Sequence, residues 1–175
     1  MPSSVAPPPV AGGATRAQDG FRHWASAWVP VVLCIGVIAI ESTIAFGADH
    51  TSGPLQRFCE FLFQRHFSQP EWWRLHLIIR KGGHFTGYGI QSAAWFRGFW
   101  MTWRANDPLR SRIAVHALAM FGTFFIASCD EFHQTFLPNR NGSFLDVMTD
   151  CSGALLLQLL IWLWMTIRKR GSIQS

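Results

Sequence analysis

Charged residues are scarce in this sequence. They make up 14% of its 175 residues, whereas a soluble domain usually carries about 25%. Tyrosine is nearly absent, with one residue against fifteen phenylalanines and nine tryptophans, and 49% of the chain is hydrophobic. Tryptophan is typical of the two interfaces of a lipid bilayer. These features argue against a soluble globular domain and predict an all-α, polytopic transmembrane bundle.

Cysteine is also scarce, and the four cysteines are widely spaced: Cys34, Cys59, Cys129 and Cys151. They form no CxxC pair, so a zinc site of that type is not expected. We predict no metal site and no cofactor. A disulfide between Cys129 and Cys151 stays open, because cysteine is equally common as a small buried apolar residue.

Acidic residues are too few to balance the basic ones, and the formal net charge is +5. A basic chain can bind nucleic acid. Here, however, the basic residues flank apolar segments, which is typical of the positive-inside bias of membrane proteins. We therefore expect no nucleic-acid partner.

Four apolar runs are long enough to cross a bilayer, which needs about 20 residues. They cover residues 24–46, 82–103, 113–129 and 147–167. The first is longer than the apolar region of a signal peptide, so we predict a retained helix. In the second, Gly83 and Gly87 form a small-xxx-small pair that predicts a close helix contact.

The remaining segments are more polar. Residues 47–80 mix aromatic and charged side chains, which predicts an amphipathic interfacial helix with Trp72 and Trp73 at the headgroup level. A plain surface loop is the alternative. Residues 1–22 contain three consecutive prolines and two consecutive glycines, which predicts a disordered tail. This leaves a transmembrane domain over 23–170 and a short tail over 171–175.

The charge distribution predicts the orientation. With both termini in the cytoplasm, the inner side holds nine basic and two acidic residues, and the outer side holds six basic and eight acidic ones. The connection over residues 97–112 alone contains four arginines. Because basic loops stay inside, we predict a multi-pass protein of the cytoplasmic membrane with cytoplasmic termini.

Three polar clusters fall at the predicted outer ends of the helices. They are Lys81, His84 and Tyr88, then Asp130, Glu131, His133 and Gln134, then Asp146 and Asp150. Asp146 opens a helix, where the helix dipole favours a carboxylate. Asp130 and Glu131 close one, where the dipole disfavours them, so they need a cation, a metal or a ligand nearby.

The stretch from Asp130 to Arg140, DEFHQTFLPNR, is similar to the Asp-Glu-x-x-Gln-x-Phe-x-Pro-x-Arg motif of the VanZ-like family. The match continues through Ser143, Asp146, Asp150 and Gly153, and Lys81, His84, Phe85 and Tyr88 resemble an upstream Lys-x-x-His-Phe-x-x-Tyr element. The similarity covers residues 80–160. Two positions depart from it: Asp150 stands where Asn is commoner, and Asn139 where Gly is commoner.

The resemblance implies a multi-pass bacterial membrane protein of the cell envelope. The family is named after a protein associated with resistance to the lipoglycopeptide teicoplanin. We expect a non-enzymatic protein that binds a charged group at the outer membrane face, and we assign no catalytic residue. The expected partners are membrane lipids, with a peptidoglycan precursor or a lipoglycopeptide as further candidates. The predicted cluster comprises Lys81, His84, Tyr88, Asp130, Glu131, Gln134, Arg140, Ser143, Asp146 and Asp150.

Two other functions stay open. The carboxylates and histidines of the cluster would suit a metal-dependent hydrolase or transferase that acts on a lipid headgroup, although their spacing matches no common metal motif. The cluster would also suit a structural network of ion pairs without a ligand. Transport is disfavoured, because the helix centres show no continuous polar path. We interpret His116 as an interfacial histidine.

Overall fold

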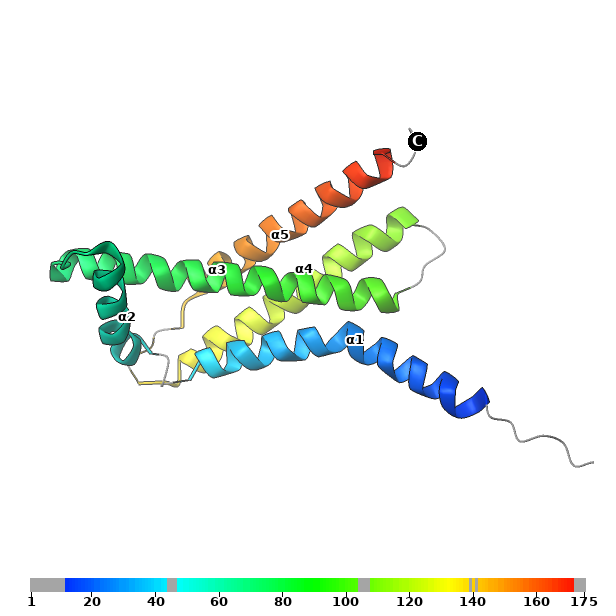
Figure 1. Ribbon diagram of the computed structural model, residues 1–175, viewed down its shortest axis with the longest axis horizontal. Helices are drawn as coiled ribbons and strands as arrows, with labels where there is room; N and C mark the ends of the chain where they lie inside the picture. Colours follow the sequence, from blue (N-terminus) through cyan, green and yellow to red (C-terminus); the bar gives the residue numbers. More distant parts are fainter. Residues whose placement is uncertain (1–11, 44–46, 104–107, 139, 141, 172–175) are drawn as a thin grey trace, which may run out of the picture.

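The computed structural model describes residues 12–43, 47–103, 108–138, 140 and 142–171, and within these it contains only α-helices. There are five: α1 (Gly12–Glu41), α2 (Ala48–Phe63), α3 (Gln69–Thr102), α4 (Pro108–Gln134) and α5 (Phe144–Gly171). Figure 1 shows α1, α3, α4 and α5 packed as a bundle, with α2 beside the first turns of α3. The prediction of an all-α bundle with an additional short helix is therefore confirmed.

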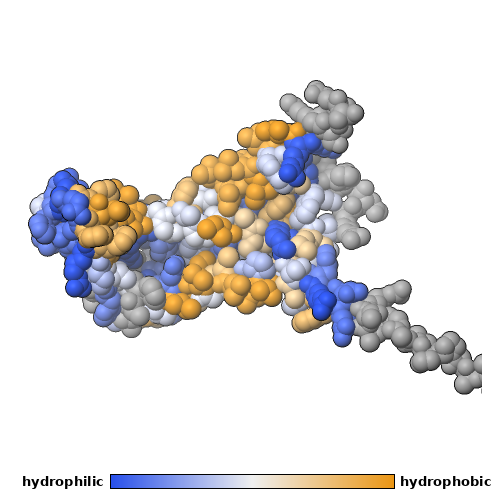
Figure 2. Space-filling view, viewed as in Figure 1, coloured by the Kyte–Doolittle hydropathy of each residue, from blue (hydrophilic) through white to orange (hydrophobic). Residues whose placement is uncertain are grey.

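Three segments are long and apolar enough to cross a membrane: Gln18–Glu41, Ser111–Gln134 and Phe144–Lys169. Their outward faces carry exposed large apolar side chains such as Leu33, Phe121 and Leu163, and Figure 2 shows hydrophobic surface over the middle of the bundle. Such faces suit lipid rather than water. The molecule is thus a helical membrane bundle.

Helix α3 is the fourth member of the bundle and packs against α1, α4 and α5. At 34 residues it is the longest helix, and it is more polar than the three apolar segments. Figure 1 shows that α1 and α4 run in one direction and α3 and α5 in the other. Because the four helices alternate in direction, the start of α1 and the end of α5 lie at the same end of the bundle. That α3 crosses the membrane stays a prediction.

Helix α1 corrects the predicted tail. It begins at Gly12, so the segment expected to be disordered through residue 22 is helical over its second half. Alanine, arginine and glutamine dominate residues 14–18, and these residues favour a helix. Residues 1–11 lie outside the described part of the chain. Pro30 lies inside α1, and Figure 1 shows a bend along this helix, as expected where a proline removes a backbone hydrogen bond.

The closest helix contact is not at the predicted glycines. A Cβ atom built on Gly83 or Gly87 would meet nothing within 4 Å. On Gly89 it would lie 3.2 Å from the carbonyl oxygen of Gly153, and on Gly153 it would overlap the backbone of Phe85. The prediction of a contact at Gly83 and Gly87 is therefore wrong, and α3 approaches α5 through the face that carries Phe85 and Gly89.

The region between α1 and α3 contains the predicted short helix, but Trp72 is not at a free surface. Its exposed fraction is 1%, against 51% for Trp73. The indole of Trp72 donates a hydrogen bond to Ser52 Oγ at 2.7 Å and stacks on His76 with the ring centres 5.5 Å apart. Ser68 and Glu71 form a capping box that starts α3. Trp72 thus anchors α2 to α3, which corrects its predicted place among the lipid headgroups.

The interior of the bundle is polar as well as apolar. Gln158 donates hydrogen bonds to the hydroxyl and the carbonyl of Ser92, and its own carbonyl lies 2.5 Å from Nδ1 of His116. His116 is half-buried between the rings of Phe96 and Trp162. It therefore packs within the bundle instead of at an open interface. Polar contacts of this kind hold membrane helices together where burial of apolar surface cannot.

Candidate functional site

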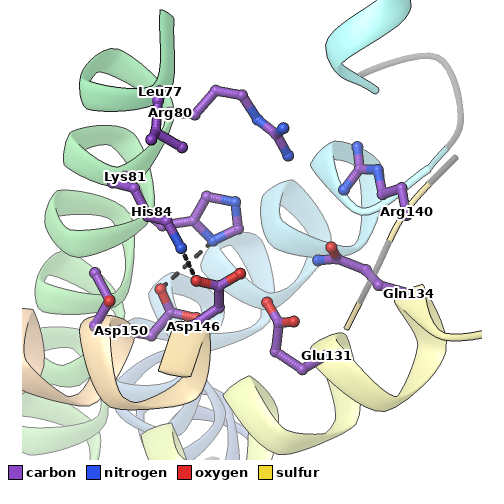
Figure 3. Close-up of a pocket in the computed structure, with 10 residues that line it drawn as sticks. Leu77, Arg80, Lys81, His84, Glu131, Gln134, Arg140, Asp146 and Asp150 are labelled. Atoms are coloured by element: carbon purple, nitrogen blue, oxygen red, sulfur yellow. Dashed lines mark ion pairs between the residues drawn. The ribbon is translucent and has the colours of Figure 1, made fainter. Parts of the chain in front are cut away.

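Three helices and one loop converge at the end of the bundle where α4 ends and α5 begins. The middle of α3 contributes Lys81 and His84, the end of α4 contributes Glu131, and the start of α5 contributes Asp146 and Asp150 (Figure 3). These side chains line a cavity of about 260 Å³. Its full lining is Leu77, Arg80, Lys81, His84, Glu131, Gln134, Arg140, Asp146, Thr149 and Asp150.

Asp130 does not line this cavity, but it connects two other residues of the predicted cluster. Its carboxylate oxygen Oδ2 accepts hydrogen bonds from the hydroxyl of Tyr88 at 2.9 Å and from Gln134 Nε2 at 3.2 Å. The exposed fraction of Asp130 is 8%, and among the described residues its other oxygen, Oδ1, has no hydrogen-bond partner. Tyr88, Asp130 and Gln134, all predicted from the sequence, are thus brought together.

Asp150 lies deeper than any other carboxylate of the site, with an exposed fraction of 0%. Its Oδ1 is 3.5 Å from Nδ1 of His84. The ring of His84 in turn stacks on Tyr88, with the ring centres 6.1 Å apart. Within the described part of the chain, neither oxygen of Asp150 has a hydrogen-bond partner. A buried carboxylate in that condition is costly, because water cannot solvate it.

Glu131 joins two helices. Its Oε2 accepts a hydrogen bond from the backbone N–H of Ser143 at 2.8 Å, and the hydroxyl of Ser143 accepts one from the N–H of Leu145 at 3.2 Å. Ser143 is therefore the N-cap of α5. A side chain at Gly142 would overlap the carbonyl of Glu131, so the loop must carry a glycine there.

The cations sit at the rim. Lys81 forms an ion pair with Asp146, and both side chains are partly exposed. Arg140 donates hydrogen bonds to the backbone carbonyls of Glu41 and Thr43, at 3.0 and 3.1 Å. Arg140 is thus not the cation that Asp130 and Glu131 were expected to need, because it binds the backbone at the end of α1.

Arg80 also lines the cavity, although the motif did not single it out as a site residue. It forms no ion pair or hydrogen bond with another described residue. Burial lowers the pKa of the Arg140 guanidinium from its ordinary value, and the nearby positive charge of Arg80 lowers it further. Two arginines thus line one cavity, and within the described part of the chain neither forms an ion pair with a carboxylate.

The end of α1 is the main part of the site that the motifs missed. Ser42 is buried, and its hydroxyl lies 3.1 Å from Nδ1 of His133. His133 therefore turns toward α1 and does not line the charged cavity. No local sequence signal marks Glu41, Ser42 or Thr43, because their role depends on where α1 ends beside α4.

A second cavity adjoins the first. It has a volume of about 620 Å³ and shares Arg80, His84 and Arg140 with the charged cavity. The rest of its lining is mainly apolar and comes from α2 and α3, with Pro54, Leu55, Phe58 and Ile79 among its members. The charged cavity therefore continues into a larger apolar one.

These features first define a class: the chain is a multi-pass helical membrane protein with a charged cavity at one end of its bundle. The model of the VanZ/LLP1 family matches residues 27–166, which include every residue that lines this cavity. The chain belongs to the VanZ/LLP1 family, as the sequence resemblance predicted. Neither a search of curated proteins nor a search of solved structures found a match.

Proposed function

We propose that the charged cavity binds the anionic, phosphate-bearing headgroup of a membrane lipid or of a lipid-linked cell-envelope precursor. The observation that carries this proposal is the pair Arg80 and Arg140, which line one cavity and have no carboxylate partner among the described residues. Figure 3 shows both guanidinium groups on the same side of the cavity, apart from the carboxylates. Arginine suits phosphate, because its planar group donates two parallel hydrogen bonds.

The adjoining apolar cavity supports a lipid over a soluble anion. An anion held by Arg80 and Arg140 would lie at the boundary of the two cavities, since both residues line both. An acyl chain attached to that anion would enter the space between Leu55, Phe58 and Ile79. Burial of such a chain contributes about 0.8 kcal/mol per CH₂ group. Free phosphate would gain nothing from this surface.

The test uses the full-length protein in nanodiscs and a fluorescent lipid with a phosphate headgroup. In the double variant Arg80→Gln/Arg140→Gln, the Kd should rise by at least about 100-fold, because each arginine contributes at least one hydrogen bond to a charged group, worth about 1.5–3 kcal/mol. Arg74→Gln is the matched control, since Arg74 is an exposed arginine on the same helix. Unchanged affinity in a well-folded double variant would overturn the proposal.

Four competitors identify the class of ligand. Unlabelled phosphatidylglycerol, a lipid-linked diphosphate and teicoplanin each carry an apolar chain, and inorganic phosphate does not. Competition by the first or second supports a lipid or a precursor. Competition by teicoplanin alone would favour a lipoglycopeptide and link the chain to resistance. Competition by inorganic phosphate at equal concentration would contradict the role of the apolar cavity.

The purely structural alternative predicts a different pattern. If the cluster only fixes the helices, each loss of binding will accompany a loss of stability. The two arginines give the sharpest comparison, because Arg80 has no ion pair to lose within the described chain. A variant Arg80→Gln that keeps its Tm and loses lipid affinity supports binding, and one that loses both equally supports structure alone.

A further inference from the structure

Negative charge is concentrated beneath the cavity without matching positive charge. Asp130, Glu131 and Asp150 have exposed fractions of 8%, 5% and 0%. Lys81 is paired with Asp146. Among the described residues, His84 is the basic side chain that lies in ion-pair range of a buried carboxylate, which is that of Asp150. Desolvating several carboxylates together is strongly unfavourable unless a cation or protons compensate them.

The geometry of three of these residues suits a metal ion. His84, Asp130 and Glu131 each offer one ligand atom, and these atoms lie within 4.8 Å of one another. Ligand atoms at about 2.0–2.2 Å from a tetrahedral zinc ion lie about 3.3–3.6 Å from one another. Side-chain shifts of about 1 Å therefore close the group around a single ion.

The hydrogen-bond partners of Asp130 give a second, independent reason to place an ion here. Oδ2 of Asp130 is fixed by Tyr88 and Gln134, while the buried Oδ1 has no partner in the described part of the chain. Buried oxygens in this condition are rare in proteins and call for a ligand. Oδ1 of Asp150 lies 3.5 Å from Nδ1 of His84, and carboxylates are common neighbours of metal-bound histidines.

From this arrangement, we propose that His84, Asp130 and Glu131 bind one divalent ion of the zinc or manganese type. One imidazole nitrogen with two carboxylate oxygens suits these ions better than magnesium or calcium, which prefer oxygen alone. His84 and Glu131 also line the cavity, so an ion with three protein ligands keeps an open position there. This site does not depend on lipid binding, and either proposal can fail without the other.

The test titrates the full-length protein with Zn²⁺ and with Mn²⁺ alone, in nanodiscs of neutral lipid and after removal of bound metal. Calorimetry should show one site per chain. Asp130→Asn and His84→Gln should each weaken binding by at least about tenfold, the loss seen even for outer-shell residues of metal sites. The control is Asp19→Asn, which removes an exposed carboxylate from a distant part of α1. No binding by the wild type, or equal binding by all variants, overturns the proposal.

Infrared spectroscopy keeps the test decisive where a variant does not fold. If protons compensate the buried carboxylates, the metal-free wild type shows the band of a protonated carboxyl group. The band is compared in Asp150→Asn, because Asp150 is buried but is not a proposed ligand. There the proposal requires that saturating Zn²⁺ or Mn²⁺ remove the band, since a ligand carboxylate must be ionised, and a band that persists in that variant overturns it.

Discussion

Glu131, at the end of α4, accepts a hydrogen bond from the backbone N–H of Ser143 at the start of α5. This contact explains a carboxylate that the dipole of its own helix disfavours. The positive end of the next helix compensates it. Glu131 therefore lies in the last turn of α4, accepts a hydrogen bond from the backbone at the start of α5 and lines the cavity.

Replacement of Glu131 should separate these roles. Glu131→Ala leaves the N–H of Ser143 without its acceptor and should destabilise the protein by about 1.5–3 kcal/mol, because the bond involves a charged group. Glu131→Gln keeps an acceptor and should cost less. The measurement is reversible unfolding in micelles without added metal, with the exposed Glu41→Ala as control. Equal stability of the alanine variant and the wild type would contradict the helix-joining role.

The contact between α3 and α5 should not tolerate a side chain at its closest point. In Gly153→Ala, the added methyl group overlaps the backbone of Phe85, and overpacking of this kind costs about 1–3 kcal/mol. Gly36→Ala is the matched control, because Gly36 lies in α1 with nothing within 4 Å of the new atom. The Tm of both variants checks this, and a fall in the control as large as in Gly153→Ala would refute it.

The apolar runs predicted the bundle because lipid imposes a length and a composition on each crossing segment. They underestimated the helices at their polar ends. Helix α4 continues to Gln134 and α5 begins at Phe144, so both helices extend beyond the apolar runs and carry the acidic residues, in agreement with the helical placement expected for Asp130, Glu131 and Asp146. Residues 12–22 were missed for the same reason, since they are helical without being apolar.

The motifs predicted which polar residues share the site but not how they pair. Lys81 and Asp146, and His84 and Asp150, are partners from the predicted clusters. Arg140 instead binds backbone carbonyls of α1, a choice no side-chain pattern can reveal. Such contacts depend on where one helix ends beside another, which is a property of packing rather than of sequence spacing.

Charge exchange should distinguish the two pairings. Lys81→Asp/Asp146→Lys restores an ion pair, so the double variant should recover the stability that each single variant loses. That loss should be at most about 1 kcal/mol, since both side chains are partly exposed. Glu131→Arg/Arg140→Glu should show no recovery, because these residues bind backbone groups instead of each other. A double-mutant cycle on the Tm checks both, and recovery in the second exchange would contradict the contacts found.

The topology can be tested with single cysteines in a cysteine-free variant. Ser68 and Thr102 are exposed and lie just before and at the end of α3. If α3 crosses the membrane and basic loops stay inside, a membrane-impermeant thiol reagent added to intact cells labels Ser68→Cys and spares Thr102→Cys. Permeabilised cells provide the control, in which both react. Labelling of both in intact cells, or of Thr102→Cys alone, would contradict this orientation.

The packing of α2 on α3 should weaken in mild acid. His76 is buried against Trp72, and burial, followed by the nearby charge of Arg80, lowers its pKa from the ordinary 6.5. Because the pKa is lower in the packed state, a proton binds more tightly when His76 is exposed. The stabilisation is complete above about pH 6.5 and is lost as the pH falls through the lowered pKa.

Two carboxylates of the same region titrate in a different range. Hydrogen bonds from the backbone of Phe67 and of Ser68 lower the pKa of Glu60 and of Glu71 from 4.5, so their contributions disappear only in stronger acid. Amide hydrogen exchange of α2 between about pH 7.5 and 5.5 therefore excludes these carboxylates, and the variant His76→Phe distinguishes His76 from His50 and His66 of the same region. Exchange should accelerate in the wild type, beyond the intrinsic effect of pH, and much less in His76→Phe, where no proton can bind. Equal acceleration in both proteins would show that another group controls this contact.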